Sequence, residues 1–151
     1  QAVLDNRIDV IATDHAPHTL EEKSRNYLDA PSGGPLVQHA LMAMLEKMEQ
    51  GKISIEKIVE KMAHAPAELF RIKDRGYIRE GYFADLTMVN LNDPWKVTAG
   101  NLRYKCQWSP LMDRSFSSKI RKVFVNGELA YDEGAIKSKP SGMRLKFSKS
   151  R

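Results

Sequence analysis

One short segment near the start of the chain constrains its fold more than any other feature. Residues 8–13 read Ile-Asp-Val-Ile-Ala-Thr, a mostly apolar, β-branched run that is typical of a strand buried on both faces. The run leads directly into residues 14–18, Asp-His-Ala-Pro-His, where Pro17 ends any regular structure. A buried strand needs hydrogen-bonding neighbours, and the few preceding residues cannot supply them. We therefore expect the chain to begin in the middle of a larger fold.

The next part of the chain predicts a loop and then helices. Residues 19–35 are polar and rich in Gly, Pro and Ser, and loops of this length are usually functional or disordered. Apolar residues then recur at three- and four-residue spacing over 36–48, which predicts a helix that Gly51 ends. Ser54 is expected to cap a second helix, and Pro66 to stand in the first turn of a third.

After Gly76 the hydrophobic period changes from helical to alternating. Residues 85–91 predict a strand, and the runs 119–125 and 128–131 flank Asn-Gly at 126–127, the strongest signal for a two-residue hairpin. This β half has too few strands to close a sandwich alone, so we expect it to need further strands.

The positive charge of the chain is concentrated at its C-terminal end. The net charge is +5, and the last fifteen residues contain no acidic side chain but six basic ones: Lys137, Lys139, Arg144, Lys146, Lys149 and Arg151. Without these six, 18 of the 24 basic side chains remain against 19 acidic ones. No aromatic-rich basic stripe of the kind that binds nucleic acid accompanies them, so we predict no nucleic-acid partner. A solvated tail and a contact with an anionic partner both remain open.

The cysteine content and the length of the apolar runs indicate in which cellular compartment the protein is expected. The single cysteine, Cys106, cannot form an internal disulfide, which favours a reducing cytoplasm. No apolar run approaches the roughly 20 residues of a membrane helix, and the start of the chain does not look like a signal peptide. We expect a cytoplasmic protein with no membrane partner.

The chemistry of the chain is expected around Asp14. A carboxylate at the C-terminal end of a buried strand, opening onto a long loop, stands where α/β barrels and sheets place catalytic groups. Such a carboxylate can ligate a divalent metal and exchange a proton with water, and His18 can donate to a substrate carboxylate. Gly33 and Gly34 would let backbone N–H groups approach an anion. The alternative is that Asp14 caps the following turn and the histidines are merely solvated.

The segment from Asp9 to His18 resembles the last-strand signature of dihydroorotase, in the amidohydrolase superfamily. The resemblance continues to about Gly134 through several further motifs: Ala30-Pro31-Ser32-Gly33, Ala65-Pro66-Ala67, Gly76 to Leu86, Trp108-Ser109-Pro110 and Val125-Asn126-Gly127. It implies an α/β fold: the C-terminal part of a (β/α)8 TIM-like barrel plus part of a satellite β-sandwich. The implied division is 1–75 for the last strand, substrate loop and closing helices, 76–136 for the sandwich half and 137–151 for the basic tail.

The resemblance also implies roles for particular residues. Asp14 would be both a metal ligand and the general acid/base, in a family whose complete site holds two zinc ions. His18 would contact the substrate carboxylate, and the backbone at Ser32 and Gly33 would bind the substrate. His15, next to the ligand, would at most support it.

The remaining metal ligands that the resemblance implies lie upstream of the aspartate and are not in this chain: a His-x-His pair, a carboxylated lysine and two further histidines. His39 and His64 stand on predicted helices and are expected to be structural or solvent-facing. Ser32, Ala65 and Leu111 replace residues that are more usual in the family, which leaves the shape of the loops open. We therefore expect the isolated chain to be inactive and to bind divalent metal poorly.

The activity implied is the reversible interconversion of N-carbamoyl-L-aspartate and L-dihydroorotate in pyrimidine biosynthesis, with a small-molecule substrate and a possible homodimer. Two alternatives stay open: a hydantoinase- or allantoinase-like hydrolase, and a catalytically silent dihydroorotase-like subunit that scaffolds a partner enzyme. Among the other residues, Cys106 is either a small packed residue or a reactive thiol, and no adjacent histidine supports a nucleophile. Trp95 and Trp108 are expected to anchor packing, and residues 21–23 to form a solvated loop or a lid.

Overall fold

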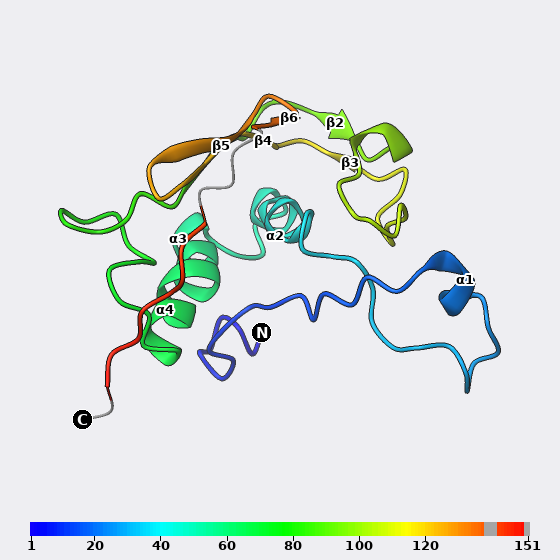
Figure 1. Cartoon of the computed structure of the whole chain (residues 1–151), viewed down its shortest axis with the longest axis horizontal. Coiled ribbons are helices and arrows are strands. Elements are labelled where there is room, and N and C mark those ends of the chain that lie inside the picture. Colours follow the sequence, from blue (N-terminus) through cyan, green and yellow to red (C-terminus); the bar gives the residue numbers. More distant parts are fainter. Residues whose placement is uncertain (138–141, 150–151) are drawn as a thin grey trace.

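The computed structural model describes residues 1–137 and 142–149, so the predicted basic tail lies partly outside the described residues. The helical elements are α1 (Leu20–Lys23), α2 (Ala40–Glu49), α3 (Ile55–Val59), the π-helical turn η1 (Glu60–His64), α4 (Ala65–Leu69) and the 3-10 turn η2 (Ala99–Asn101). The strands are β1 (Leu86–Asn90), β2 (Trp95–Lys96), β3 (Ser115–Phe116), β4 (Lys119–Val125), β5 (Glu128–Asp132) and β6 (Ala135–Ile136). In the view of Figure 1 the strands lie on one side of α2 and the N-terminal segment on the other.

The segment 8–13, where the sequence predicts a buried strand, forms no β-strand in the structure. Its one backbone hydrogen bond to a distant residue runs from the Ile11 N–H to the Lys61 carbonyl, at 3.0 Å. Ile8 is 44% exposed, so the segment is not buried on both faces. A strand exists only through hydrogen bonds to a neighbouring strand, and no strand of the described residues lies beside this one.

Helix α2 begins at Ala40, later than the apolar spacing predicts. Two backbone N–H groups just before the helix donate to side chains from other parts of the chain. The Leu36 N–H donates to His15 Nδ1 at 3.2 Å, and the Gln38 N–H donates to the Tyr104 hydroxyl at 3.0 Å. These bonds satisfy N–H groups that no helical turn covers. The predicted end of the helix is confirmed, since α2 ends at Glu49, just before Gly51.

Helices α3 and α4 are joined by the π-helical turn instead of being separate, as the sequence predicts. Ser54 caps α3 as expected, its hydroxyl accepting from the Lys57 N–H at 3.2 Å. The helical backbone then continues through η1 into α4, which contains Pro66. We attribute the π turn to this proline, because it has no N–H to donate and its ring crowds the preceding turn.

The predicted strand and hairpin of the β half are confirmed. The main sheet has the order β1-β4-β5-β6, and every neighbouring pair is antiparallel. Asn126 and Gly127 connect β4 to β5 with φ values of 53° and 85°. Both values are positive, as the type I′ turn of a two-residue hairpin requires, and Asn followed by Gly tolerates that backbone best. A second, two-stranded sheet pairs β2 with β3.

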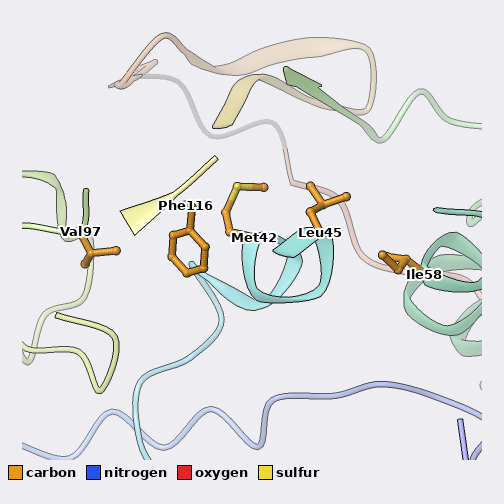
Figure 2. Packing of buried hydrophobic residues seen from close by; sticks show 5 residues of the cluster. All are labelled: Met42, Leu45, Ile58, Val97 and Phe116. Atoms are coloured by element: carbon orange, nitrogen blue, oxygen red, sulfur yellow. The ribbon is translucent and has the colours of Figure 1, made fainter. Parts of the chain in front are cut away.

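The hydrophobic core joins the helices to the small sheet. Figure 2 shows its five most buried side chains, which are at most 2% exposed: Met42 and Leu45 of α2, Ile58 of α3, Val97 after β2 and Phe116 of β3. Trp95 packs against this cluster and donates its indole N–H to the Ser118 carbonyl at 2.8 Å, which confirms its predicted role as a packing anchor. The expected barrel part and the expected β part therefore share one core.

The fold is a mixture of helices and strands, as predicted. Among the described residues, no helix has the length and apolar character needed to cross a membrane.

Candidate functional site

Asp14 has a backbone conformation that is uncommon for a residue with a side chain. Its φ is +44°, in the left-handed region that Asp tolerates better than most residues. The residue is exposed, and its carboxylate has no hydrogen-bond or ion-pair partner among the described residues. A strained backbone that presents an unpaired carboxylate is a feature of functional sites. The side chain is free to bind a cation or to exchange a proton.

The segment after Asp14 runs beside the Ser32-Gly33-Gly34 turn. The Ala16 N–H donates to the Gly34 carbonyl at 3.1 Å, and His15 and Gly34 form a parallel β-bridge. Gly33 has a φ of +83°, and a Cβ there would lie 2.7 Å from the Ala16 Cβ. Only glycine fits this approach without a shift of the backbone. The structure thus brings Gly33 next to the Asp14 segment, while the exposed Ser32 hydroxyl has no partner among the described residues.

His15 links this segment to the start of the α2 region. Its Nδ1 accepts from the Leu36 N–H at 3.2 Å, and its ring packs against Tyr104 with centroids 5.4 Å apart. Accepting at Nδ1 leaves the Nε2 atom to carry the proton of the neutral ring. His15 therefore acts as a structural support beside Asp14, in keeping with the limited role expected of it.

His18 is held at its backbone. Its N–H donates to the Ala16 carbonyl at 2.9 Å, and its own carbonyl accepts from the Trp108 indole N–H at 2.7 Å. The half-buried imidazole lies 3.7 Å from a Glu22 carboxylate oxygen. At this distance the two groups form an ion pair when the ring is protonated. The ring is thus placed on a fixed turn next to the Asp14 segment.

Thr19 caps the short helix α1 (Leu20–Lys23), within the stretch where the sequence predicts a solvated loop or a lid. Glu22 accepts from the Thr19 N–H at 2.7 Å, while the Thr19 hydroxyl accepts from the Glu22 N–H, which together make a capping box at the start of α1. These hydrogen bonds, the backbone one first, lower the pKa of the Glu22 carboxyl below its ordinary value. The Thr-x-x-Glu spacing was the signal that could have predicted this helix.

The rest of the predicted loop, residues 24–35, is held at its base by a hydrogen bond and is exposed to solvent at its tip. The Lys23 ammonium donates to the Pro31 carbonyl at 2.6 Å. At the tip, Tyr27 is 94% exposed and Leu28 is 92% exposed. A loop fixed at its base and exposed at its tip can contact a substrate or another part of a larger protein.

Two residues that the sequence did not assign to the site, Tyr104 and Trp108, come from the connection between β2 and β3. Tyr104 contacts the His15 ring and accepts from Gln38, and Trp108 binds the His18 carbonyl. Trp108 was expected to anchor packing, and its partner turns out to be the site segment. No local sequence pattern could reveal these contacts, because Tyr104 and Gln38 are 66 positions apart and Trp108 and His18 are 90 positions apart.

The described residues do not complete a metal site. They contain no group of three or more His, Cys, Asp or Glu side chains that could hold a metal ion. A structural or catalytic zinc ion needs at least three protein ligands, so Asp14 could fill only one position.

Two histidines outside the site have structural positions, as expected. His39 is fully buried among aromatic rings, and burial lowers the pKa of its imidazole below the ordinary value. Its Nδ1 is 3.4 Å from the Tyr104 hydroxyl and 3.4 Å from the Ser109 hydroxyl, and its Nε2 has no partner among the described residues. His64 stacks on Tyr77 with ring centroids 4.1 Å apart.

Comparison with known sequences matches residues 1–130 to the family described as the amidohydrolase family. A curated dihydroorotase from Halobacterium salinarum is 40% identical over 110 residues, which cover 73% of this chain and 26% of that protein. A curated dihydroorotase from Pyrococcus furiosus is 34% identical over 140 residues, covering 93% of this chain and 33% of that protein. The chain therefore spans about a third of the length of these relatives or less.

Comparison with solved structures finds similar folds in hydantoinases. The L-hydantoinase of Arthrobacter aurescens aligns with a TM-score of 0.84 at 26% identity, over 91% of this chain and 32% of that one. The D-hydantoinase of a Thermus species aligns with the same TM-score of 0.84 at 20% identity, over 91% of this chain and 31% of that one. The second likeness concerns the fold alone.

Proposed function

Because the chain belongs to the amidohydrolase family, we propose that it is the C-terminal portion of a dihydroorotase, which interconverts N-carbamoyl-L-aspartate and L-dihydroorotate. The observation that carries the proposal is the unpaired Asp14 carboxylate, on a strained backbone directly beside the Gly33 turn. The curated dihydroorotases similar to most of this chain support the choice of reaction. The proposal concerns the whole protein, of which this chain supplies one part of the site.

In the hydrolytic direction, Asp14 would move one proton. Water adds through its oxygen to the ring carbonyl carbon, and the Asp14 carboxylate takes the proton that the water loses. As the carbon–nitrogen bond breaks, Asp14 returns this proton to the departing ring nitrogen. The products are a ureido group and a carboxylic acid, which loses its remaining proton to the solvent, and Asp14 is again a carboxylate. A positioned general acid/base of this kind contributes about 10²–10⁴-fold to a rate.

Substrate binding would fall to His18 and the Ser32-Gly33 backbone. An imidazole N–H and backbone N–H groups both donate to a carboxylate, and dihydroorotate carries one carboxylate on its ring. Zinc, which the resemblance implies, would find one ligand in this chain, Asp14, and needs others from elsewhere. We propose further that residues 1–75 close a TIM-like barrel, that 76–136 form half of a β-sandwich, and that the whole enzyme is a cytoplasmic homodimer.

The first experiment assays the isolated chain for opening of dihydroorotate with added zinc. We expect no turnover and weak zinc binding, because the described residues lack a complete ligand set. Robust turnover by this chain alone would contradict the proposal.

The second experiment supplies the missing part. The chain is joined behind the N-terminal two thirds of the Pyrococcus furiosus dihydroorotase, in place of the matching segment, and ring opening is measured. Asp14→Asn is expected to reduce kcat at least about 100-fold, because an amide cannot accept the proton. Asp9→Asn is the matched control, since Asp9 is exposed in the same segment. Equal activities of the two variants would show that Asp14 is not the proton carrier.

The likeness to the Arthrobacter aurescens L-hydantoinase supports a second candidate, a hydantoinase-like hydrolase. The joined enzyme separates the two candidates when it is offered dihydroorotate and hydantoin, of which only the first carries a carboxylate. Preference for dihydroorotate supports the main proposal, and preference for hydantoin supports the alternative. Inactivity towards both, with the fold intact, would favour a silent scaffold subunit.

A further inference from the structure

Trp108 is bonded to one segment of the proposed site and lies beside the other. Its indole N–H donates to the His18 carbonyl at 2.7 Å, across 90 positions of the sequence. The same ring lies beside Gly34, where an added Cβ would be 3.7 Å from the Trp108 Cη2 atom. One side chain is therefore close to both the turn that carries His18 and the turn that carries the Gly33 backbone.

The loop that carries Trp108 is itself held in place. The Gln107 N–H donates to the Tyr104 carbonyl at 3.1 Å, and the buried Ser109 hydroxyl accepts from the Leu111 N–H at 3.1 Å. Tyr104, also buried, holds the Gln38 N–H on the neighbouring segment. A ring on such a support can fix the position of a hydrogen-bond partner to within a fraction of an ångström.

We propose that Trp108 is a positioning residue that sets the place of His18 relative to the Ser32-Gly33 backbone, and so determines how tightly a substrate carboxylate is held. The inference rests on the proposed function, in which these two groups receive the carboxylate. In this inference Trp108 acts through the His18 turn, by its bond to the His18 carbonyl, and takes no part in the reaction at the carbon or the nitrogen. Its loss is therefore expected to weaken binding of carboxylate-bearing substrates while it leaves the chemical step nearly unchanged.

The chain offers a matched control in its other tryptophan. Trp95 also donates its indole N–H to a backbone carbonyl, that of Ser118, at 2.8 Å, but it does so in the hydrophobic core. Trp108→Phe and Trp95→Phe each remove one indole-to-carbonyl hydrogen bond and keep an aromatic ring. A role of Trp108 in stability alone predicts similar effects for both variants, and a positioning role does not.

The first measurement is hydrogen exchange on the 151-residue chain. We expect Trp108→Phe to speed the exchange of amides in the peptides spanning 14–20 and 32–37, and Trp95→Phe to leave these peptides unchanged. Equal exchange of these peptides in the two variants would overturn the inference.

The second measurement uses the joined enzyme with dihydroorotate and with dihydrouracil, which lacks the carboxylate. Trp108→Phe is expected to raise KM for dihydroorotate about fivefold, the factor that one hydrogen bond of ordinary strength represents, with kcat nearly unchanged. KM for dihydrouracil is expected to stay the same, as are both values in Trp95→Phe. A lower kcat, or equal changes of KM for both substrates, would contradict the inference.

The two proposals fail in different ways. If the unsubstituted joined enzyme opens neither ring, the proposed function fails, and the exchange measurement still decides whether Trp108 positions the His18 turn. If the unsubstituted enzyme is active and Trp108→Phe leaves KM for dihydroorotate unchanged, the function stands and the inference about Trp108 fails.

Discussion

Two adjacent glycines allow a sharp test of the site geometry, because the structure predicts opposite outcomes for the same substitution. Gly33 has a φ of +83°, and a Cβ there would lie 2.7 Å from the Ala16 Cβ. Gly34 has no positive φ, and a Cβ there would meet Trp108 and Pro110 at 3.7 and 3.9 Å, which is ordinary van der Waals contact. Gly33→Ala is therefore expected to disrupt the turn, and Gly34→Ala to be accepted.

The expected cost at Gly33 has two parts. Placing an alanine in the left-handed region costs roughly 1–2 kcal/mol. Overpacking a close contact costs about 1–3 kcal/mol more. Together they lower the free energy of unfolding by roughly 2–5 kcal/mol, whereas Gly34→Ala is expected to change it by less than about 1 kcal/mol in either direction.

Urea unfolding of the two variants measures this difference. With a slope of about 2 kcal/mol per molar urea, a loss of 2 kcal/mol lowers the midpoint by about 1 M. The turn can also escape the clash by moving away from Ala16, which breaks the 3.1 Å bond from the Ala16 N–H to the Gly34 carbonyl. In that case the Ala16 amide exchanges faster in Gly33→Ala. Identical midpoints and identical Ala16 exchange in the two variants would refute the proposed packing of the turn on the Asp14 segment.

Two further predictions concern buried or bonded histidines. His15→Ala removes the acceptor for the Leu36 N–H and is expected to lower the free energy of unfolding by about 1 kcal/mol, while His15→Asn, which keeps an acceptor oxygen, is expected to lose less in urea unfolding. Because burial lowers the pKa of His39, the unfolded chain binds a proton at this position more readily than the folded one. Stability is therefore expected to be fully present above the ordinary imidazole pKa of about 6.5 and to fall as the pH drops below it. Comparison of unfolding at pH 7.5 and pH 5.5 checks this, and the His39-dependent part of the difference is expected to vanish in His39→Phe.

Several elements could be predicted from the sequence because their causes lie within a few residues. The Asn126-Gly127 turn needs two positive φ values, and Ser54 caps its helix through a bond to an amide three residues away. The same local chemistry would have predicted α1 from Thr19 and Glu22, had its capping box been recognised. Asp14 and Gly33 could be nominated for a site because their residue types and spacing are those of a strand end and an anion-binding turn.

Tertiary structure decided what these nominated residues contact. Residues 8–13 have the composition of a buried strand, yet they form none, because strand pairing depends on a neighbour and not on composition. The π turn lies directly before Pro66. The local sequence predicts a break between two helices there, but the helical backbone continues through the turn into α4. The supports at His15 and Trp108 arise from bonds between residues 21 and 90 positions apart. Local backbone preferences depend on neighbouring residues, whereas the position of the turn at Asp14 to His18 depends on side chains that only packing brings together.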